Sequence, residues 1–140
     1  MAGNDFAAQV RAMTEKCKQR QDAIFRASAA RVMDEANVPE AQGGRMPVKD
    51  GFLRNSTTAA TSPSGGGSDP ALVFAKLEVG QTVYAGWTAE YAMRQEFGFV
   101  GEDSLGREYN QSGKAFLRTS LQRWQEYVDD AARDAEAKIR

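Results

Sequence analysis

The stretch NDFAAQVRAMTEKCKQRQDAIFRASAARVMDEA, residues 4–36, decides the fold of this 140-residue chain. It contains no Gly and no Pro, and its apolar side chains fall at Phe6, Val10, Met13, Cys17 and Ile24. Their intervals of three, four or seven residues place them on one face of an α-helix. Asn4 or Asp5 can cap the start of this helix. We expect its end near Asn37, because Pro39 disfavours helical geometry at the residue before it.

The length of this helix leaves two alternatives for its packing. In one, the whole helix packs against the core of its own domain. In the other, one end projects or packs on another subunit, because the modest core of a chain this small cannot cover every turn.

A second helical pattern starts near Lys114 and occupies the end of the chain. Its apolar positions recur every three or four residues. They are Leu117, Leu121, Trp124, Val128, Ala131, Ala135 and Ile139. Beyond Val128 only small side chains continue the stripe among several acidic residues, so we expect this end to be weakly anchored within one subunit.

The segment between the two helices predicts strands. Residues 52–58 are typical of a short strand, and residues 71–79 and 82–87 predict a hairpin with its turn at Val79-Gly80-Gln81-Thr82. A short helix is expected over residues 89–97, ended by Gly98. Strands without parallel crossovers indicate an α+β fold, with a small antiparallel sheet of the hairpin plus one or two strands packed against the long N- and C-terminal helices.

Two further segments predict mobile loops, at about residues 59–70 and 100–113. The first holds the run Ser64-Gly65-Gly66-Gly67-Ser68, and the second contains three Gly residues. Segments with few large apolar side chains bury too little surface to order themselves. Neither flank of these loops is large enough to fold alone, so we expect residues 1–140 to form a single domain.

Composition excludes several classes of function. The chain has 18 basic and 19 acidic residues, a net charge of −1, no His and one Cys. A balanced charge argues against a general nucleic-acid binder, which needs a basic excess. Without His there is no His-based triad or His metal site, and one Cys forms neither an internal disulfide nor a thiolate cluster. We therefore expect no enzyme, with no catalytic residues, no cofactor and no metal.

Targeting signals are not visible in the sequence. A membrane-spanning helix needs about 18 consecutive apolar residues, and no apolar run in the sequence is close to that length, so we expect no membrane association. The first residues lack the basic and then apolar pattern of a signal peptide. A lone Cys fits synthesis in a reducing, intracellular compartment.

Single residues that suggest chemistry have ordinary structural interpretations. The carboxylate pairs Asp34-Glu35, Glu102-Asp103 and Asp129-Asp130 are expected on solvated surfaces, where nothing shifts their pKa toward neutrality. The Gly run at residues 64–68 lacks the Lys of a phosphate-binding loop. Cys17 lies on the apolar stripe and is expected to be a buried structural thiol.

Four aromatic residues are expected in the core or at a subunit interface. They are Tyr84, Trp87, Tyr91 and Trp124. They fall at the ends of elements and on apolar stripes, and no basic run accompanies them. A stacking platform for single-stranded nucleic acid is therefore the less favoured interpretation.

Three blocks of sequence follow one another along the chain. They are MPVKDGFLRNS at residues 46–56, Tyr91-Ala92 with Glu96-Phe97-Gly98, and KAFLR at residues 114–118. In this order, with a long helix before the first block and another after the last, the chain resembles the tail-component family of tailed double-stranded DNA bacteriophages. The positions that carry the resemblance are Pro47, Gly51, Leu53, Arg54, Ser56, Tyr91, Ala92, Glu96, Gly98, Phe116 and Leu117.

The resemblance implies a structural protein of the virion, synthesised in the cytoplasm of the bacterial host. It implies a neck or head-tail connector subunit, in a homo-oligomeric ring of six- or twelvefold symmetry. Its partners would be portal, adaptor or head-closure proteins on one side and the tail tube or terminator protein on the other. DNA would only pass through the channel, whose surface we expect to be neutral or acidic.

Cyclic symmetry requires each subunit to give one surface and receive another. The candidate interface residues are Leu72, Phe74, Tyr84 and Trp87, because the predicted hairpin can add strands to the sheet of a neighbour. In isolation we expect a monomer or mixed oligomers, since rings of this kind often close only on their template.

Three alternatives stay open. A tail terminator that caps the tail tube differs from a neck protein only in its partner. A non-virion assembly chaperone or protein-binding regulator belongs to another class. A weak nucleic-acid binder would use Arg11, Lys16, Lys18, Arg20, Arg26 and Arg31, but these share the first helix with five acidic residues, which favours a solvated mixed face.

Overall fold

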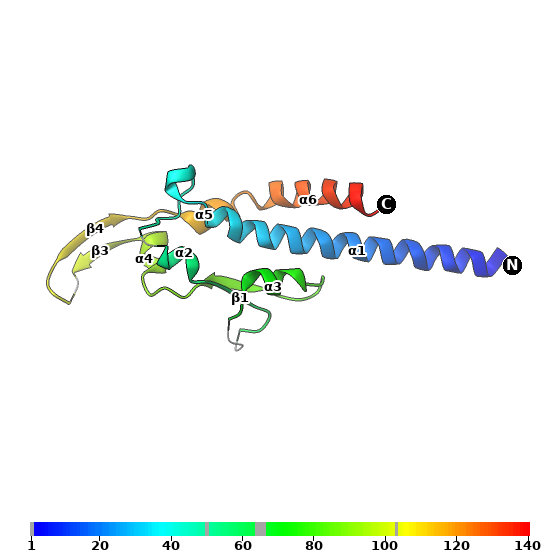
Figure 1. The fold of residues 1–140 in the computed structure, drawn as a ribbon, viewed down its shortest axis with the longest axis horizontal. Coiled ribbons are helices and arrows are strands. Elements are labelled where there is room, and N and C mark those ends of the chain that lie inside the picture. The colour runs from blue at the N-terminus through cyan, green and yellow to red at the C-terminus, as the bar shows by residue number, and fades with distance from the viewer. Residues whose placement is uncertain (1, 50, 64–66, 103) are drawn as a thin grey trace.

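Helix α1 (Ala2–Ala36) confirms the predicted long N-terminal helix. The computed structural model describes residues 2–49, 51–63, 67–102 and 104–140. Figure 1 shows α1 along the long axis of the molecule, with the N-terminus at one extremity and a β-hairpin at the other. The other elements pack along the C-terminal half of α1, so its N-terminal half extends beyond them.

The C-terminal helical region consists of two helices where the sequence predicted one. These are α5 (Phe116–Leu121) and α6 (Trp124–Lys138). α6 runs back along α1 in the antiparallel direction (Figure 1). The break changes which side chains face α1, because Tyr127 is 1% exposed whereas Leu121 and Trp124 of the predicted stripe are 50% and 40% exposed. Ala131 and Ala135 are buried as the stripe predicted.

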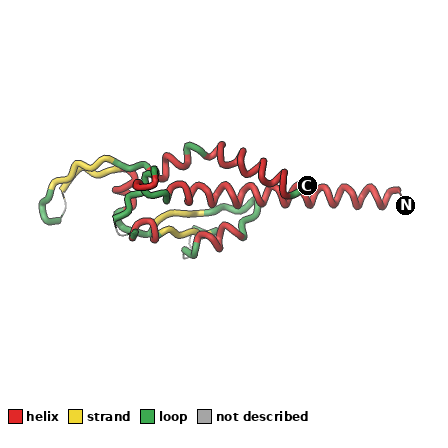
Figure 2. Tube along the Cα trace, turned by 45° about the horizontal axis from the view of Figure 1, so that its top comes forward, coloured by secondary structure: helices red, strands yellow, loops and turns green. Residues whose placement is uncertain are grey.

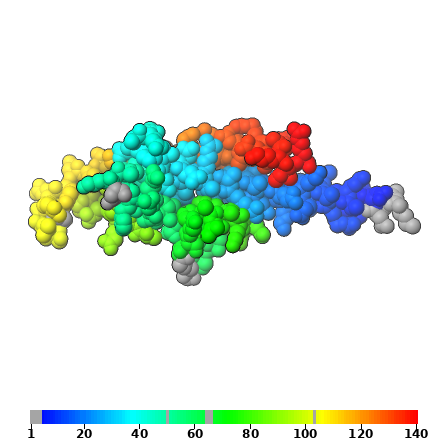
Figure 3. Space-filling view, in the orientation of Figure 1, coloured from blue at the N-terminus to red at the C-terminus, as the bar shows by residue number. Residues whose placement is uncertain are grey.

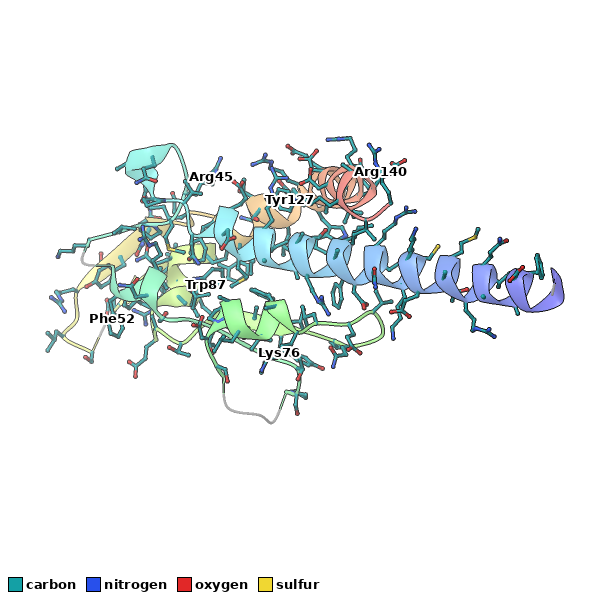
Figure 4. The ribbon with its side chains drawn as sticks, turned by 45° about the vertical axis from the view of Figure 1, so that its right-hand side comes forward. Arg45, Phe52, Lys76, Trp87, Tyr127 and Arg140 are labelled. Carbon is teal, nitrogen blue, oxygen red and sulfur yellow. The ribbon has the colours of Figure 1, made fainter. Side chains whose placement is uncertain are left out.

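The first hydrophobic core lies around α1, with α6 on one side and β1 and α3 on the other (Figure 1). Its buried members are Ala29, Val32, Met33, Ala59, Phe74, Leu77 and Tyr127. The Ser120 hydroxyl donates to the carbonyl of Val32 at 2.7 Å and lies 3.2 Å from the Tyr127 hydroxyl. Figure 4 shows Tyr127 between α6 and α1. The buried hydroxyls thus join α1, α5 and α6 through one short chain of hydrogen bonds.

Charged side chains border this core. The Arg31 guanidinium bonds to the Asp130 carboxylate at 2.8 Å and lies over the ring of Tyr127, 4.5 Å from its centroid. The hydrogen bond from Arg31 lowers the pKa of Asp130. The two residues of the Asp129-Asp130 pair, which was predicted to be solvated, therefore have different surroundings. Asp130 forms ion pairs with Arg31 and Arg133, whereas Asp129 accepts a hydrogen bond from Gln125.

The strands form two separate antiparallel ladders, so the fold is α+β as predicted. β1 (Thr57–Ala60) pairs with β2 (Tyr84–Trp87), with Thr57 opposite Trp87. β3 (Gly98–Glu102) pairs with β4 (Glu108–Ser112), with Gly98 opposite Ser112. In Figure 2 the first ladder lies under α1, and the second extends away from the body.

The prediction of a hairpin arm over residues 71–79 is wrong. This segment begins with helix α3 (Pro70–Ala75). The Asp69 carboxylate accepts a bond from the amide of Ala71 at 3.1 Å, and Pro70 occupies the first turn, so local capping favours a helix. Phe74 and Leu77, three residues apart, are the buried side chains of the segment.

Two short helices also replace or shorten predicted elements. The strand expected over residues 52–58 begins instead with α2 (Phe52–Asn55), and only Thr57 onward is extended. The helix expected over residues 89–97 is α4 (Ala92–Phe97), and it ends at Gly98 as predicted. A 3-10 turn, η1 (Glu40–Gln42), follows α1.

Both predicted mobile loops contain ordered structure. Residues 100–113, predicted to be a loop, are mostly the β3–β4 hairpin. In the other loop Ala59 and Ala60 belong to β1, and Ser68 bridges to Ala59. Residues 64–66 of the Gly/Ser run, together with Asp103 of a predicted carboxylate pair, lie outside the described residues.

Replacing Ser120 by Ala tests the hydrogen-bond chain between the helices. We expect Ser120→Ala to lower the free energy of unfolding by about 1–3 kcal/mol, because the Val32 carbonyl and the Tyr127 hydroxyl lose their partner inside the core. Urea denaturation followed by circular dichroism measures this. The control Ser104→Ala changes an exposed serine and should leave the midpoint unchanged. Equal midpoints for all three proteins would contradict the assignment.

Candidate subunit interface

The three sequence blocks meet at one place, which we name the motif junction: residues 46–56, 91–98 and 114–118. Its core is the second hydrophobic cluster, and the buried members are Ala36, Met46, Leu53, Ala89 and Phe116. All three blocks and the last turn of α1 surround this cluster or lie next to it. Segments far apart in the sequence are thus held together by one small core.

The Glu96 carboxylate connects two of these blocks. It is 5% exposed, and its two oxygens accept bonds from the amides of Leu117 and Arg118, both at 2.9 Å. The first amides of a helix have no partner within it, and the helix dipole favours an anion there. Glu96, at the end of α4, therefore caps α5 from another element.

The backbone strengthens this connection. The backbone amide of Lys114 donates to the backbone carbonyl of Gln95 at 2.7 Å, and the amide of Ala115 donates to the Glu96 carbonyl at 3.1 Å. Ala115 has φ 54°, and it is the one non-glycine residue with positive φ in the described part of the chain. That conformation turns the chain from β4 into α5 while keeping its amide directed at α4.

Two glycines make this approach possible. A Cβ on Gly98 would lie 2.5 Å from the Gln111 carbonyl oxygen, and one on Gly113 would lie 2.5 Å from the Glu96 carbonyl oxygen. Real Cβ atoms do not approach so closely. Gly98 also has φ 87°, which only Gly adopts readily. Gly98 is one of the positions that carry the family resemblance, and both its close backbone contacts and its positive φ require glycine there.

The first block contributes a short anchored helix. Gly51, with φ 80°, precedes α2, and Leu53 is 2% exposed. The Ser56 hydroxyl donates to the Leu53 carbonyl at 2.7 Å and accepts from the amide of Ala89 at 3.2 Å. This block is thereby tied to the segment before α4. Asp50 lies outside the described residues.

The remaining resemblance positions lie around the same junction. Leu117 and Ala92 are half-buried and pack on its core. Pro47 is half-buried, and Arg54 is exposed. Tyr91 is 37% exposed and stacks on Phe52, with ring centroids 6.2 Å apart.

Of the four candidate interface residues, one is buried and another is half-buried against the core. Phe74 is 6% exposed. The Trp87 ring packs edge-on against the Phe116 ring, with centroids 4.9 Å apart, and its indole nitrogen donates to the Asn37 side-chain oxygen at 2.9 Å. Leu72 and Tyr84 are 61% and 44% exposed. Because residues 70–75 are helical, only Tyr84–Trp87 of the predicted hairpin is a strand, and the interface role of these four residues stays a prediction.

Large exposed apolar side chains are scattered over the body, and two sets of them lie at its extremities. One set lies on residues 5–19 of α1, which we name the α1 arm and which extends beyond the body (Figure 3). Its members are Phe6, Val10 and Met13. Cys17, predicted to be buried, is exposed on the same arm. The other set surrounds the β3–β4 hairpin and includes Met93, Phe97, Val100 and Leu105.

A groove lies where the α1 arm joins the body. It has a volume of about 540 Å³ and is lined by Gln21, Ile24, Phe25, Ser28, Val79, Gly80, Gln81, Trp124 and Val128. Ser28 is 1% exposed, and its hydroxyl has no hydrogen-bond partner among the described residues. No local sequence pattern predicts this groove, because its walls come from three separate segments.

A larger hollow of about 830 Å³ lies on another side of α1, between α1, α2 and α3. Its lining is mixed and includes Arg26, Asp34, Arg54 and Asp69. Desolvation, and then the neighbouring Glu35 charge, raise the pKa of Asp34. Within the described part of the chain no three Cys, Asp or Glu side chains gather as metal ligands would.

The chain has no match among protein-family models, curated proteins or solved structures. The resemblance of its three blocks to the tail-component family therefore stays a prediction. None of the described helices is both long and apolar enough to cross a membrane.

The cap formed by Glu96 can be tested by removing one acceptor. We expect Glu96→Gln to destabilise the fold by about 1–3 kcal/mol, because the amide group of Gln presents a donor to one of the two α5 amides. Thermal unfolding by calorimetry measures this. The exposed neighbour Glu90→Gln is the matched control. A loss equal to that of the control would contradict a capping role.

Two of the glycines with positive φ, Gly98 and Gly106, allow backbone strain to be separated from steric clash. Gly106, with φ 76° and open space around it, should tolerate Ala at a cost of about 1 kcal/mol. Gly98→Ala should cost clearly more, since its Cβ would collide with backbone atoms. Chemical denaturation of both variants compares them. If Gly98→Ala were no more destabilising than Gly106→Ala, the close approach would not constrain the fold.

Proposed function

We propose that the chain is a structural subunit of the head-tail junction of a tailed bacteriophage, where it forms a neck or connector ring. The observation that carries the proposal is the pair of apolar-bearing projections at opposite extremities of an elongated body, the α1 arm and the β3–β4 hairpin (Figure 1). Exposed apolar patches on a small protein mark interaction sites. A ring subunit needs two different surfaces, one for each neighbour.

The sequence resemblance supplies the biological setting. Its three blocks build the motif junction, which fixes the hairpin to the body through Glu96 and Gly98. Such a junction suits a rigid joint that presents projecting parts to neighbours. In this proposal the ring joins portal or adaptor proteins to the tail, and DNA passes through a neutral or acidic channel.

The hydrogen-bond partners of the basic side chains of α1 argue against the alternative of a nucleic-acid binder. Three of the six basic residues of this alternative form hydrogen bonds within the chain. Arg20 donates to the Ile139 carbonyl, Arg26 to the Leu77 carbonyl and Arg31 to the Asp130 carboxylate. Side chains that hold the fold together are not available to neutralise phosphates along a continuous face.

The proposal can be tested on purified phage particles produced by the genome that encodes this chain. We expect mass spectrometry to find the protein in the particles, and electron microscopy to place it as a ring between the portal and the tail. A ring on the tail tube alone would identify a terminator. Absence from particles, with the protein present in infected cells, would overturn the virion proposal in favour of an assembly chaperone.

A further inference from the structure

The α1 arm carries an apolar stripe that the rest of its own chain does not cover. Phe6 and Met13 are 69% and 68% exposed, and Val10 lies between them at 46%. In a helix that advances 100° per residue, all three fall on one side. The opposite side carries Ala8, Ala12 and Glu15. The arm is thus amphipathic, with its apolar side in solvent.

The groove continues this same side of α1 toward the body. Gln21, Ile24 and Ser28 follow Cys17 at intervals of four, three and four residues, so they extend the stripe of the arm. Trp124 and Val128 of α6 form one further wall, and Val79 forms another. The amide of Val79 donates to the Asp22 carboxylate at 3.0 Å, which holds that wall against α1.

The charges beside the stripe and the groove are complementary. Lys16 and Lys18 lie on the two flanks of the arm's stripe, whereas Glu15 is directed away from it. Beside the groove, Glu78 precedes Val79 and Asp129 follows Val128, and both are exposed. The arm has three bases against two acids, and α6 has two bases against five acids. A basic helix therefore suits the groove better than an acidic or a neutral one.

We propose that the α1 arm of one copy binds in the groove of a neighbouring copy. Phe6, Val10 and Met13 would pack against Ile24, Val79 and Trp124 of that copy, which is the helix-in-groove mode of recognition. The buried Ser28 hydroxyl would gain a polar partner from the flank of the arm. The contact joins two different patches, so it can continue from copy to copy and close a ring.

This inference names the contact between subunits, and it rests on the proposed function only for its one-way direction. If both copies inserted their arms into each other, a closed pair would result. An antiparallel pair of that kind would bring the two Cys17 residues together. A polar joint between head and tail instead requires a contact that continues around a ring.

Two variants of the full-length chain break the two halves of the contact. Val10→Asp with Met13→Asp places charge on the stripe, and Val79→Asp places charge in the groove. The matched controls are Ala8→Asp with Ala12→Asp on the opposite side of the arm, and the exposed Thr82→Asp, which is outside the groove. None of the substituted side chains is buried in the core, and Val79 in the groove wall is 55% exposed. Circular dichroism should therefore show that every variant folds like the wild type.

Analytical ultracentrifugation over a wide concentration range measures association. We expect the wild-type chain and both controls to form oligomers larger than two copies. Each contact variant should weaken association by at least about tenfold, because an Asp would be buried against an apolar wall. Mixing the two contact variants should restore one contact and give a heterodimer, since one supplies an intact arm and the other an intact groove.

Three results would overturn the inference. One is a wild-type chain that stays monomeric at every concentration. Another is a Val79→Asp variant that associates like the wild type, as packing of arm against arm would allow. The third is a wild-type mass that stops at two copies with a disulfide between the Cys17 residues under mild oxidation, which would show a reciprocal pair. If the mixing result holds but purified particles lack the protein, the contact stands and the virion proposal alone fails.

Discussion

The buried carboxylate of Glu96 is the contact on which the hairpin end of the molecule depends. It holds the first amides of α5 while the backbone of Gln95 and Glu96 holds the residues just before that helix. The end of α4 and the start of α5 are therefore fixed to each other. The chain between them leaves the body as one closed hairpin, and its two ends approach so closely that both must be Gly.

Helix α1 has two different environments along its length. From Ser28 to Ala36 it carries the buried side chains that α3, α5 and α6 pack against, and ion pairs such as Arg31 with Asp130 lie at the border. From residue 5 to 19 it satisfies its own backbone hydrogen bonds but leaves its apolar side in water. An isolated helical segment of about 15 residues is marginal in water, so a partner surface would stabilise the arm. The same helix thus organises one subunit and offers a surface to the next.

Local signals explain which elements could be predicted. α1 was predictable because a long 3.6-residue period without Gly or Pro has one interpretation. α3 was mispredicted because the alternation of Val73, Ala75 and Leu77 outweighed the capping signal of Asp69-Pro70, which was also in the sequence. The β3–β4 hairpin was missed because its Gly residues indicated a loop. The burial of Tyr127 rather than Trp124 depends on the break after Leu121, for which the sequence has no strong signal.

The sequence by itself determined the α+β class, the long first helix and the end of α4 at Gly98, because these depend on side chains within a few positions of one another. Only the tertiary structure decided that α6 returns along α1, that Glu96 caps a helix 20 residues away, and that a groove opens beside Ser28. These features bring together atoms from distant segments, and no local pattern records which distant surface a side chain will meet. Of the predicted interface residues, Phe74 is buried and Trp87 is half-buried against the core, whereas Leu72 and Tyr84 are exposed, and for that reason our proposal places the contact on the α1 arm and the groove.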